Sequence, residues 1–276
     1  MNKSEVYRVN RHLVMIPGPT PTVPLIEREM GRAVTAHGDP QFVADYKETI
    51  ESAGKLLDCS GQTFIIAGSG TLAMEMAIGN NLKAGDNLLV VSHGYFGDRF
   101  VDIAERKGIN VDVISSKWGT IVPLEELEKK LKSKKYAAVT VTHVDTSTAV
   151  LAPIAEIGHL IDDISPETVY MVDGVAATAG AEAYVDKMHI DVLFTASQKA
   201  FGVCPGLTIL FASEKSLNRR KQLGKIADYY ADYENWIPTM ENPAKYCSTP
   251  SVNLIWALKK SIEIIKDEGI EKRRAS

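Results

Sequence analysis

The sequence contains few cysteines, and their spacing offers no metal site. Cys59, Cys204 and Cys247 are the only three in 276 residues, and they form neither a Cys-x-x-Cys pair nor another zinc-ligand pattern. We expect reduced thiols in a cytoplasmic protein, with Cys204 in a packing role although it lies near Lys199 in sequence.

Long apolar runs, an excess of positive charge and internal repeats are absent as well. No window reaches the roughly 18 apolar residues of a membrane span, and residues 1–12 lack the apolar core of a signal peptide. The formal net charge is −4, so we expect no nucleic-acid or membrane partner. The remaining composition, 45% apolar and 24% charged, is ordinary for a globular enzyme.

Short apolar runs alternate with helical segments from residue 62 onward. Apolar runs without internal alternation are typical of parallel strands that are buried on both faces. The sequence therefore predicts an α/β fold with a mainly parallel seven-stranded sheet and helices on both faces. The expected strands are 63–67, 87–91, 111–114, 137–142, 169–172, 192–194 and 208–211, and the expected helices are 22–34, 39–57, 72–81, 99–107, 124–132, 154–164 and 251–267.

Lys199 follows one of these buried runs, residues 190–194, in the loop Thr195-Ala-Ser-Gln-Lys-Ala-Phe-Gly202. Burying an ammonium group is costly unless it is paired or neutralised. A lysine with a lowered pKa is a nucleophile suited to Schiff-base formation. The alternative is an ordinary surface lysine at the end of a strand, so the rest of the chain has to decide.

Gly68-Ser-Gly-Thr71 also follows an expected strand and opens an expected helix. Free backbone N–H groups and the helix dipole make such a start suitable for phosphate. Residues 68–73 also fit the dinucleotide pattern G-x-G-x-x-G/A, which requires an acid at the end of the next strand. That strand ends in Ser92-His93, so a single phosphate fits better than a dinucleotide.

Three further segments follow expected strands at their carboxyl ends, which is the edge of the sheet where parallel α/β folds bind ligands. His93-Gly-Tyr-Phe-Gly-Asp-Arg99 is expected to be a loop whose aromatic rings stack on a planar ligand or on each other. Thr142-His-Val-Asp-Thr-Ser-Thr148 gathers hydroxyl groups, with His143 as a hydrogen-bonded structural residue. Asp173 ends an apolar strand one strand–helix–strand step before Lys199, so an acid and an amine are expected to face one small ring.

These motifs resemble, in order and spacing, those of class V aminotransferases of pyridoxal phosphate fold type I. The resemblance is strongest to the alanine–glyoxylate and serine–pyruvate aminotransferase branch. It runs from Ile16-Pro-Gly-Pro19 to about Trp256, which is nearly the whole chain. The expected fold is thus the large domain of that fold type, and the expected cofactor is pyridoxal 5′-phosphate.

The resemblance also implies a role for each site residue. Lys199 is similar to the Schiff-base lysine that moves the proton during transamination, and Asp173 to the partner of the pyridine nitrogen. Gly18 is expected near the substrate. The residues expected around the cofactor are Phe96 and Val175 at the two ring faces, Thr146 near the ring hydroxyl, Ser69, Gly70, Thr71 and Gln198 at the phosphate, and Tyr246 and Thr249 at the phosphate of the other subunit of a homodimer.

The division expected from the resemblance is an N-terminal arm at 1–20, a cofactor-binding large domain at 21–250, and the start of a small domain at 251–276. Relatives continue into a complete small domain, which carries the arginine that binds the substrate carboxylate. No residue of this chain matches that arginine, so either the small domain is largely missing or the carboxylate is bound differently. Val144, Asp145 and Ala149 depart from the family pattern only in loop shape.

The leading hypothesis is transamination between serine or alanine and a 2-oxo acid such as glyoxylate or pyruvate. A cysteine desulfurase or lyase of the same class is an alternative, although those relatives carry a histidine where Gln198 stands. A dimeric scaffold that binds the cofactor without catalysis is a second alternative. A nicotinamide dehydrogenase is a third and rests on residues 68–73 alone.

Overall fold

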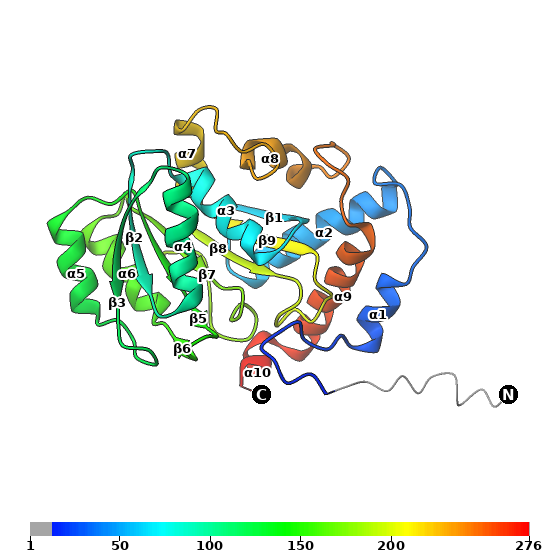
Figure 1. Ribbon diagram of the computed structural model, residues 1–276. Helices are drawn as coiled ribbons and strands as arrows, with labels where there is room; N and C mark the ends of the chain where they lie inside the picture. The colour runs from blue at the N-terminus through cyan, green and yellow to red at the C-terminus, as the bar shows by residue number, and fades with distance from the viewer. Residues whose placement is uncertain (1–12, 276) are drawn as a thin grey trace.

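A seven-stranded sheet forms the centre of the computed structural model, which describes residues 13–275 (Figure 1). Its strand order is β1-β9-β8-β7-β4-β2-β3, and β9 alone runs antiparallel to its neighbours. The predicted sheet is thus confirmed. The strands are β1 (Gln62–Ala67), β2 (Asn87–Ser92), β3 (Asn110–Ser115), β4 (Ala138–Thr142), β7 (Val169–Asp173), β8 (Val192–Ala196) and β9 (Leu207–Ala212), with a separate hairpin of β5 (Val144–Asp145) and β6 (Val150–Leu151).

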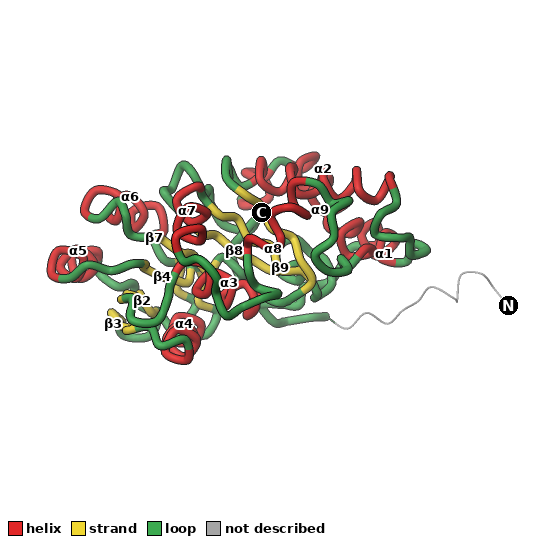
Figure 2. Tube along the Cα trace, turned by 90° about the horizontal axis from the view of Figure 1, so that it is seen from above, coloured by secondary structure: helices red, strands yellow, loops and turns green. Residues whose placement is uncertain are grey.

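Helices cover both faces of the sheet, as Figure 2 shows for α4 and α6. The seven expected helices are present, and α7, α8 and α10 are additional. Within residues 13–275, no helix has the length and apolar character to cross a membrane. The helices are α1 (Pro24–Met30), α2 (Pro40–Leu56), α3 (Gly70–Asn81), α4 (Tyr95–Arg106), α5 (Leu124–Ser133), α6 (Ile154–Ile164), α7 (Glu214–Gln222), α8 (Tyr233–Glu241), α9 (Val252–Glu268) and α10 (Ile270–Arg274).

The start of α4 corrects one expectation. Residues 93–99 were expected to form a loop, but the helix begins at Tyr95. The carboxylate of Asp145 accepts the backbone N–H groups of Phe96 (3.0 Å) and Gly97 (3.2 Å). A carboxylate at a helix N-terminus satisfies free N–H groups and favours the helix dipole. This contact joins two distant segments, so the local sequence pattern does not reveal it.

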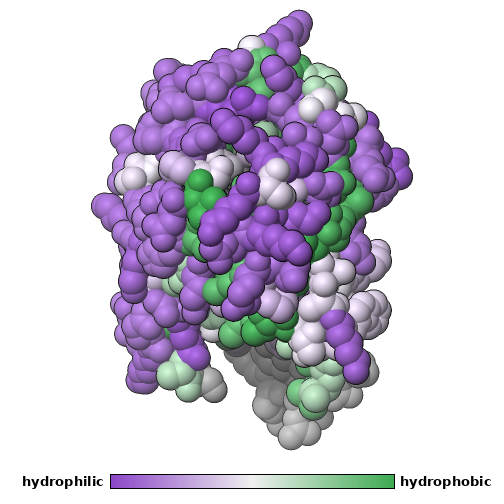
Figure 3. All heavy atoms as spheres, turned by 90° about the vertical axis from the view of Figure 1, so that its left-hand side faces the viewer, coloured by the Kyte–Doolittle hydropathy of each residue, from purple (hydrophilic) through white to green (hydrophobic). Residues whose placement is uncertain are grey.

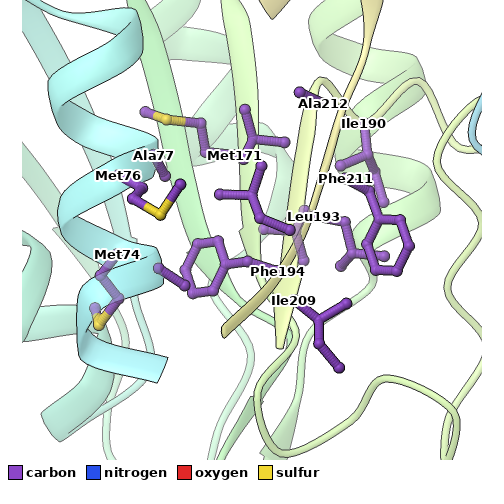
Figure 4. Close-up of a cluster of buried hydrophobic side chains, with 14 of the residues drawn as sticks. Met74, Met76, Ala77, Met171, Ile190, Leu193, Phe194, Ile209, Phe211 and Ala212 are labelled. Carbon is purple, nitrogen blue, oxygen red and sulfur yellow. The ribbon is translucent and has the colours of Figure 1, made fainter. Parts of the chain in front are cut away.

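The core lies between the sheet and its helices. Figure 4 shows Met74 and Met76 of α3 together with Phe194 on one side of β8. These side chains are almost completely buried and belong to one continuous apolar cluster. Burial of this kind, worth roughly 25 cal/mol per Å² of apolar surface, fixes α3 on the sheet. In contrast, the face around α5, at the left of Figure 1, is mostly hydrophilic (Figure 3).

α9 packs against α1 and α2, although α2 ends at residue 56 and α9 begins only at residue 252 (Figure 1). Trp256 of α9 is buried and donates its indole N–H to Asp45 Oδ2 at 3.1 Å. Its neighbours in α9 belong to the same apolar cluster as the sheet. The boundary expected at residue 251 stays a prediction, and the arm expected at 1–20 lies mostly outside the described residues.

Candidate functional site

A cavity of about 190 Å³ opens at the carboxyl ends of the strands. Its walls come from segments that follow β1, β2, β4, β7 and β8. In the sheet β8, β7, β4 and β2 are neighbours, and β9 separates β1 from β8. Most of the expected site residues meet there. The cavity is lined by Ser69, Gly70, Thr71, Phe96, Thr146, Asp173, Val175, Gln198 and Lys199, together with Met74, Arg99, Thr142, Val144 and Ala176.

Lys199 follows β8 and is half-buried. Its Nζ donates to the backbone carbonyl of Pro17 at 3.3 Å. Burial lowers the pKa of the Lys199 ammonium, and the negative charge of Asp173 partly opposes this. A lowered pKa leaves more of the amine unprotonated and hence nucleophilic. The expectation of an activated lysine at the end of a buried strand therefore has a physical basis.

Asp173 is the last residue of β7 and is buried. Its Oδ1 accepts the backbone N–H of Val175 at 2.9 Å. The pKa of this carboxyl is raised to about 6, mainly by burial and in addition by the nearby charge of Asp145. The hydrogen bond from Val175 and the charges of Arg99 and Lys199 partly oppose the rise. A buried carboxylate of this kind is stabilised when a cationic group meets it.

The N-terminus of α3 closes another side of the cavity. The Ser69 hydroxyl accepts the backbone N–H of Leu72 at 3.3 Å and caps the helix. Gly70 lies directly against Val175, because a Cβ at Gly70 would stand 2.9 Å from Val175 Cγ2. Helix N–H groups thus reach the cavity without an intervening side chain, which is the arrangement that suits a phosphate.

Phe96 and Thr146 complete the cavity from the other side. Phe96 lies in the first turn of α4, and Thr146 lies in the turn between β5 and β6. Asp145 links the two segments, since it precedes Thr146 and binds the backbone of Phe96. Phe96 and Val175 both line the cavity, and an aromatic ring together with an apolar side chain suits a planar ligand.

Three expected residues lie outside the cavity lining. Gly18 lies on the far side of Lys199, where a Cβ would stand 2.6 Å from Lys199 Cδ. Tyr246 and Thr249 lie in the segment between α8 and α9, with their hydroxyl oxygens 3.2 Å apart. Tyr246 is 62% exposed. Their expected contact with a second subunit stays a prediction.

Two buried polar atoms in the cavity wall are consistent with a polar ligand. Within residues 13–275, Gln198 Oε1 and Thr142 Oγ1 find no hydrogen-bond partner. A buried polar group without a partner costs on the order of 1–3 kcal/mol, which a bound ligand can recover. The amine of Lys199, the acid of Asp173, the start of α3 and the side chains of Phe96 and Val175 therefore fit pyridoxal 5′-phosphate. His143 lies outside this lining, and burial lowers its pKa to about 4, so it is neutral near pH 7.

Arg99 and Asp145 were not expected as site residues. Arg99 lines the cavity and donates from Nη1 to Thr71 Oγ1 at 3.2 Å. Asp145 is completely buried and, besides holding α4, accepts the Ser147 backbone N–H at 3.0 Å. The only available signal was sequence position, because both residues belong to segments that follow strands of the sheet.

Comparison with known proteins gives one consistent result. The family model described as aminotransferase class-V matches residues 31–276. Alanine–glyoxylate aminotransferase 1 of Saccharomyces cerevisiae is 36% identical over 276 residues, covering 94% of this chain and 71% of that protein. Serine–glyoxylate aminotransferase of Arabidopsis thaliana is 30% identical, and the match covers 96% of this chain and 67% of that protein.

Solved structures agree with the sequence relatives. Alanine–glyoxylate aminotransferase from Nostoc sp. superimposes with a TM-score of 0.90 at 28% identity, covering 100% of this chain and 74% of the other. Ureidoglycine–glyoxylate aminotransferase from Bacillus subtilis also superimposes with a TM-score of 0.90, at 26% identity, and the match covers 96% of this chain and 70% of the other. The similarity spans almost the whole of this chain and about 70% of the solved chains.

Proposed function

Since the chain belongs to the class-V aminotransferase family and is thus a pyridoxal 5′-phosphate-dependent enzyme, we propose that it moves an amino group from serine or alanine to a 2-oxo acid, glyoxylate or pyruvate. One observation carries the proposal. Asp173 ends β7 and Lys199 follows the neighbouring strand β8, and both line the same cavity as the N-terminus of α3. A nicotinamide dehydrogenase is set aside, because family and site both point to the other cofactor.

Different residues around the cavity would bind different parts of the cofactor. Ser69, Gly70, Thr71 and Gln198 would hold the phosphate through helix N–H groups and polar side chains. Phe96 and Val175 would enclose the ring, with Thr146 near its hydroxyl.

Bound pyridoxal 5′-phosphate supplies an aldehyde that links to amines and a ring that withdraws electrons from them. Asp173 would keep the ring nitrogen protonated, which is the state in which the ring withdraws electrons best. Meeting a cationic ring nitrogen also offsets the cost of burying the Asp173 carboxylate. Lys199 would link to the aldehyde, give up its place to the incoming amino acid, and then carry a proton on Nζ.

The choice of substrate is supported by the relatives. Those with 30% identity or more include alanine–glyoxylate and serine–glyoxylate aminotransferases, as well as an L-aspartate–glyoxylate aminotransferase. Glyoxylate is the acceptor common to these names. We therefore rank glyoxylate above pyruvate as acceptor, and serine and alanine above aspartate as donors.

A homodimer is part of the proposal. Tyr246 and Thr249 would reach the phosphate held by a second copy of the chain, and the exposure of Tyr246 leaves it available for that contact. Several apolar side chains before α2 are exposed as well, including Leu13, Met15 and Ile16. An exposed apolar group of this kind is typical of an interface. A cytoplasmic location is proposed from the cysteine usage.

The test is an amino-transfer assay on the protein loaded with pyridoxal 5′-phosphate. With serine or alanine and glyoxylate, the proposal expects glycine to form, and expects Lys199→Ala to abolish it. Release of sulfide from cysteine without amino transfer would favour the desulfurase alternative. Cofactor binding with neither reaction would favour the scaffold. Light scattering of the same sample tests the dimer.

A further inference from the structure

We propose that Arg99 binds the phosphate group of the cofactor together with the first turn of α3. The phosphate would then be recognised by a guanidinium group as well as by helix N–H groups. This inference rests on the cofactor assigned above and not on the choice of amino acid or 2-oxo acid.

The position of Arg99 is the first support. It lies one helical turn after Phe96 in α4, so both side chains are on the same side of the helix. Its Nη1 donates to Thr71 Oγ1 at 3.2 Å, which connects α4 to the start of α3. Arg99 and Thr71 both line the cavity, and their contact lies at the end where the helix N–H groups are free.

The guanidinium group is also held in place before any ligand arrives. Arg99 Cζ lies 5.0 Å from the ring centre of Phe96 and 5.1 Å from that of Tyr95. A guanidinium near aromatic faces is stabilised by cation–π attraction. A pre-oriented group loses less conformational freedom on binding, so its hydrogen bonds contribute more to affinity.

The charge of Arg99 is the third support. Among residues 13–275, no carboxylate lies within ion-pair distance of its guanidinium. The donation to Thr71 leaves further N–H donors of the guanidinium available. A cation beside a helix N-terminus, in a cavity wall and without an ion-pair partner, matches a doubly charged phosphate. The contact with Thr71 favours this role over binding of the substrate carboxylate.

The experiment compares two ligands that differ only in the phosphate group. The dissociation constants of pyridoxal 5′-phosphate and of pyridoxal are measured for the wild-type chain, Arg99→Met, Arg99→Lys and Arg106→Met. Arg106 is the matched control, because it lies on the same helix and forms an exposed ion pair with Asp102. Pyridoxal binding reports whether each variant keeps an intact cavity.

The proposal predicts that Arg99→Met weakens binding of pyridoxal 5′-phosphate by about 10- to 100-fold, as expected for hydrogen bonds to a charged group. Binding of pyridoxal should change by less than about threefold. Arg99→Lys should recover part of the phosphate-dependent affinity, and Arg106→Met should match the wild type.

Equal weakening for both ligands would overturn the proposal, because Arg99 would then act only on the shape of the cavity. Unchanged binding of both ligands would overturn it too. A raised KM for the amino acid with unchanged cofactor affinity would assign Arg99 to the substrate carboxylate instead. Failure of amino transfer alone would count against the proposed function and leave the phosphate comparison intact.

Discussion

Gly18 and Lys199 lie in direct contact, so that a methyl group on Gly18 would stand 2.6 Å from Lys199 Cδ and 3.0 Å from its Nζ. The same segment holds the loop of Lys199 through Thr20, whose backbone N–H donates to the Gln198 carbonyl at 2.9 Å and whose hydroxyl donates to the Lys199 carbonyl at 2.9 Å. The chain before α1 therefore helps to position the reactive amine.

Gly18→Ala should weaken cofactor attachment. Gly18 has φ +142°, a backbone conformation that favours glycine, so alanine there costs roughly 1–3 kcal/mol of stability. It also pushes the Lys199 side chain aside, and we expect about tenfold weaker attachment of pyridoxal 5′-phosphate, measured by absorbance titration.

Gly85→Ala is the matched control for this change. Gly85 also has a positive φ, +86°, but an added Cβ there meets no atom within 4 Å. We expect a similar loss of thermal stability and unchanged cofactor attachment. If both variants impaired attachment equally, the contact between Gly18 and Lys199 would have no special role.

Asp173→Asn should stabilise the cofactor-free protein at high pH. Folding raises the pKa of Asp173 from 3.8 to about 6, so its protonated form favours the folded state. That contribution is fully present below about pH 4 and is lost as the pH rises through about 6. At about pH 8 the ionised carboxylate therefore costs about 3 kcal/mol, which the neutral amide avoids.

Urea denaturation without cofactor measures this effect. The difference in the free energy of unfolding between Asp173→Asn and the wild type should fall markedly from about pH 8 to about pH 5. Asp102→Asn, at an exposed position of α4, should show no such trend. A difference that does not change with pH would contradict the raised pKa. In the loaded enzyme, the same Asp173 variant should lose most of its amino transfer.

Phe96 and Tyr95 offer a test of ring stacking with adjacent residues. Their rings lie edge to face, 5.3 Å apart, but only Phe96 lines the cavity and Tyr95 is 58% exposed. We expect Phe96→Leu to weaken cofactor binding by about tenfold, since stacking on a flat ring contributes about 1–3 kcal/mol. Tyr95→Leu removes only one of the two aromatic contacts of Arg99 and should weaken binding by less than about threefold. Equal losses in the two variants would place the ligand elsewhere.

Much of the fold could be predicted, because strands buried on both faces produce uninterrupted apolar runs such as β7 and β8. The parallel topology then placed Asp173 and Lys199 at one edge of the sheet. The family resemblance supplied Phe96, Thr146 and Gln198, which now lie in the same cavity.

The features of the fold and the site that the sequence did not predict depend on contacts between distant segments. Asp145 stabilises the start of α4 by accepting the backbone N–H of Phe96, and Arg99 of α4 donates a hydrogen bond to Thr71 of α3. Neither contact leaves a local pattern, since each partner alone is an ordinary charged or polar residue in a loop or helix. α7 and α8 were missed for a related reason. The buried Arg220 of α7 pairs with Asp232 at 2.7 Å, so part of their stability comes from an ion pair and not from an apolar stripe.

The most direct test of the account is to find which lysine carries the cofactor. The chain is mixed with pyridoxal 5′-phosphate, reduced with borohydride to make the link permanent, digested, and analysed by mass spectrometry. We expect the added mass on Lys199, and its loss in Lys199→Ala. The same yield of label on other lysines, or none on Lys199, would contradict it.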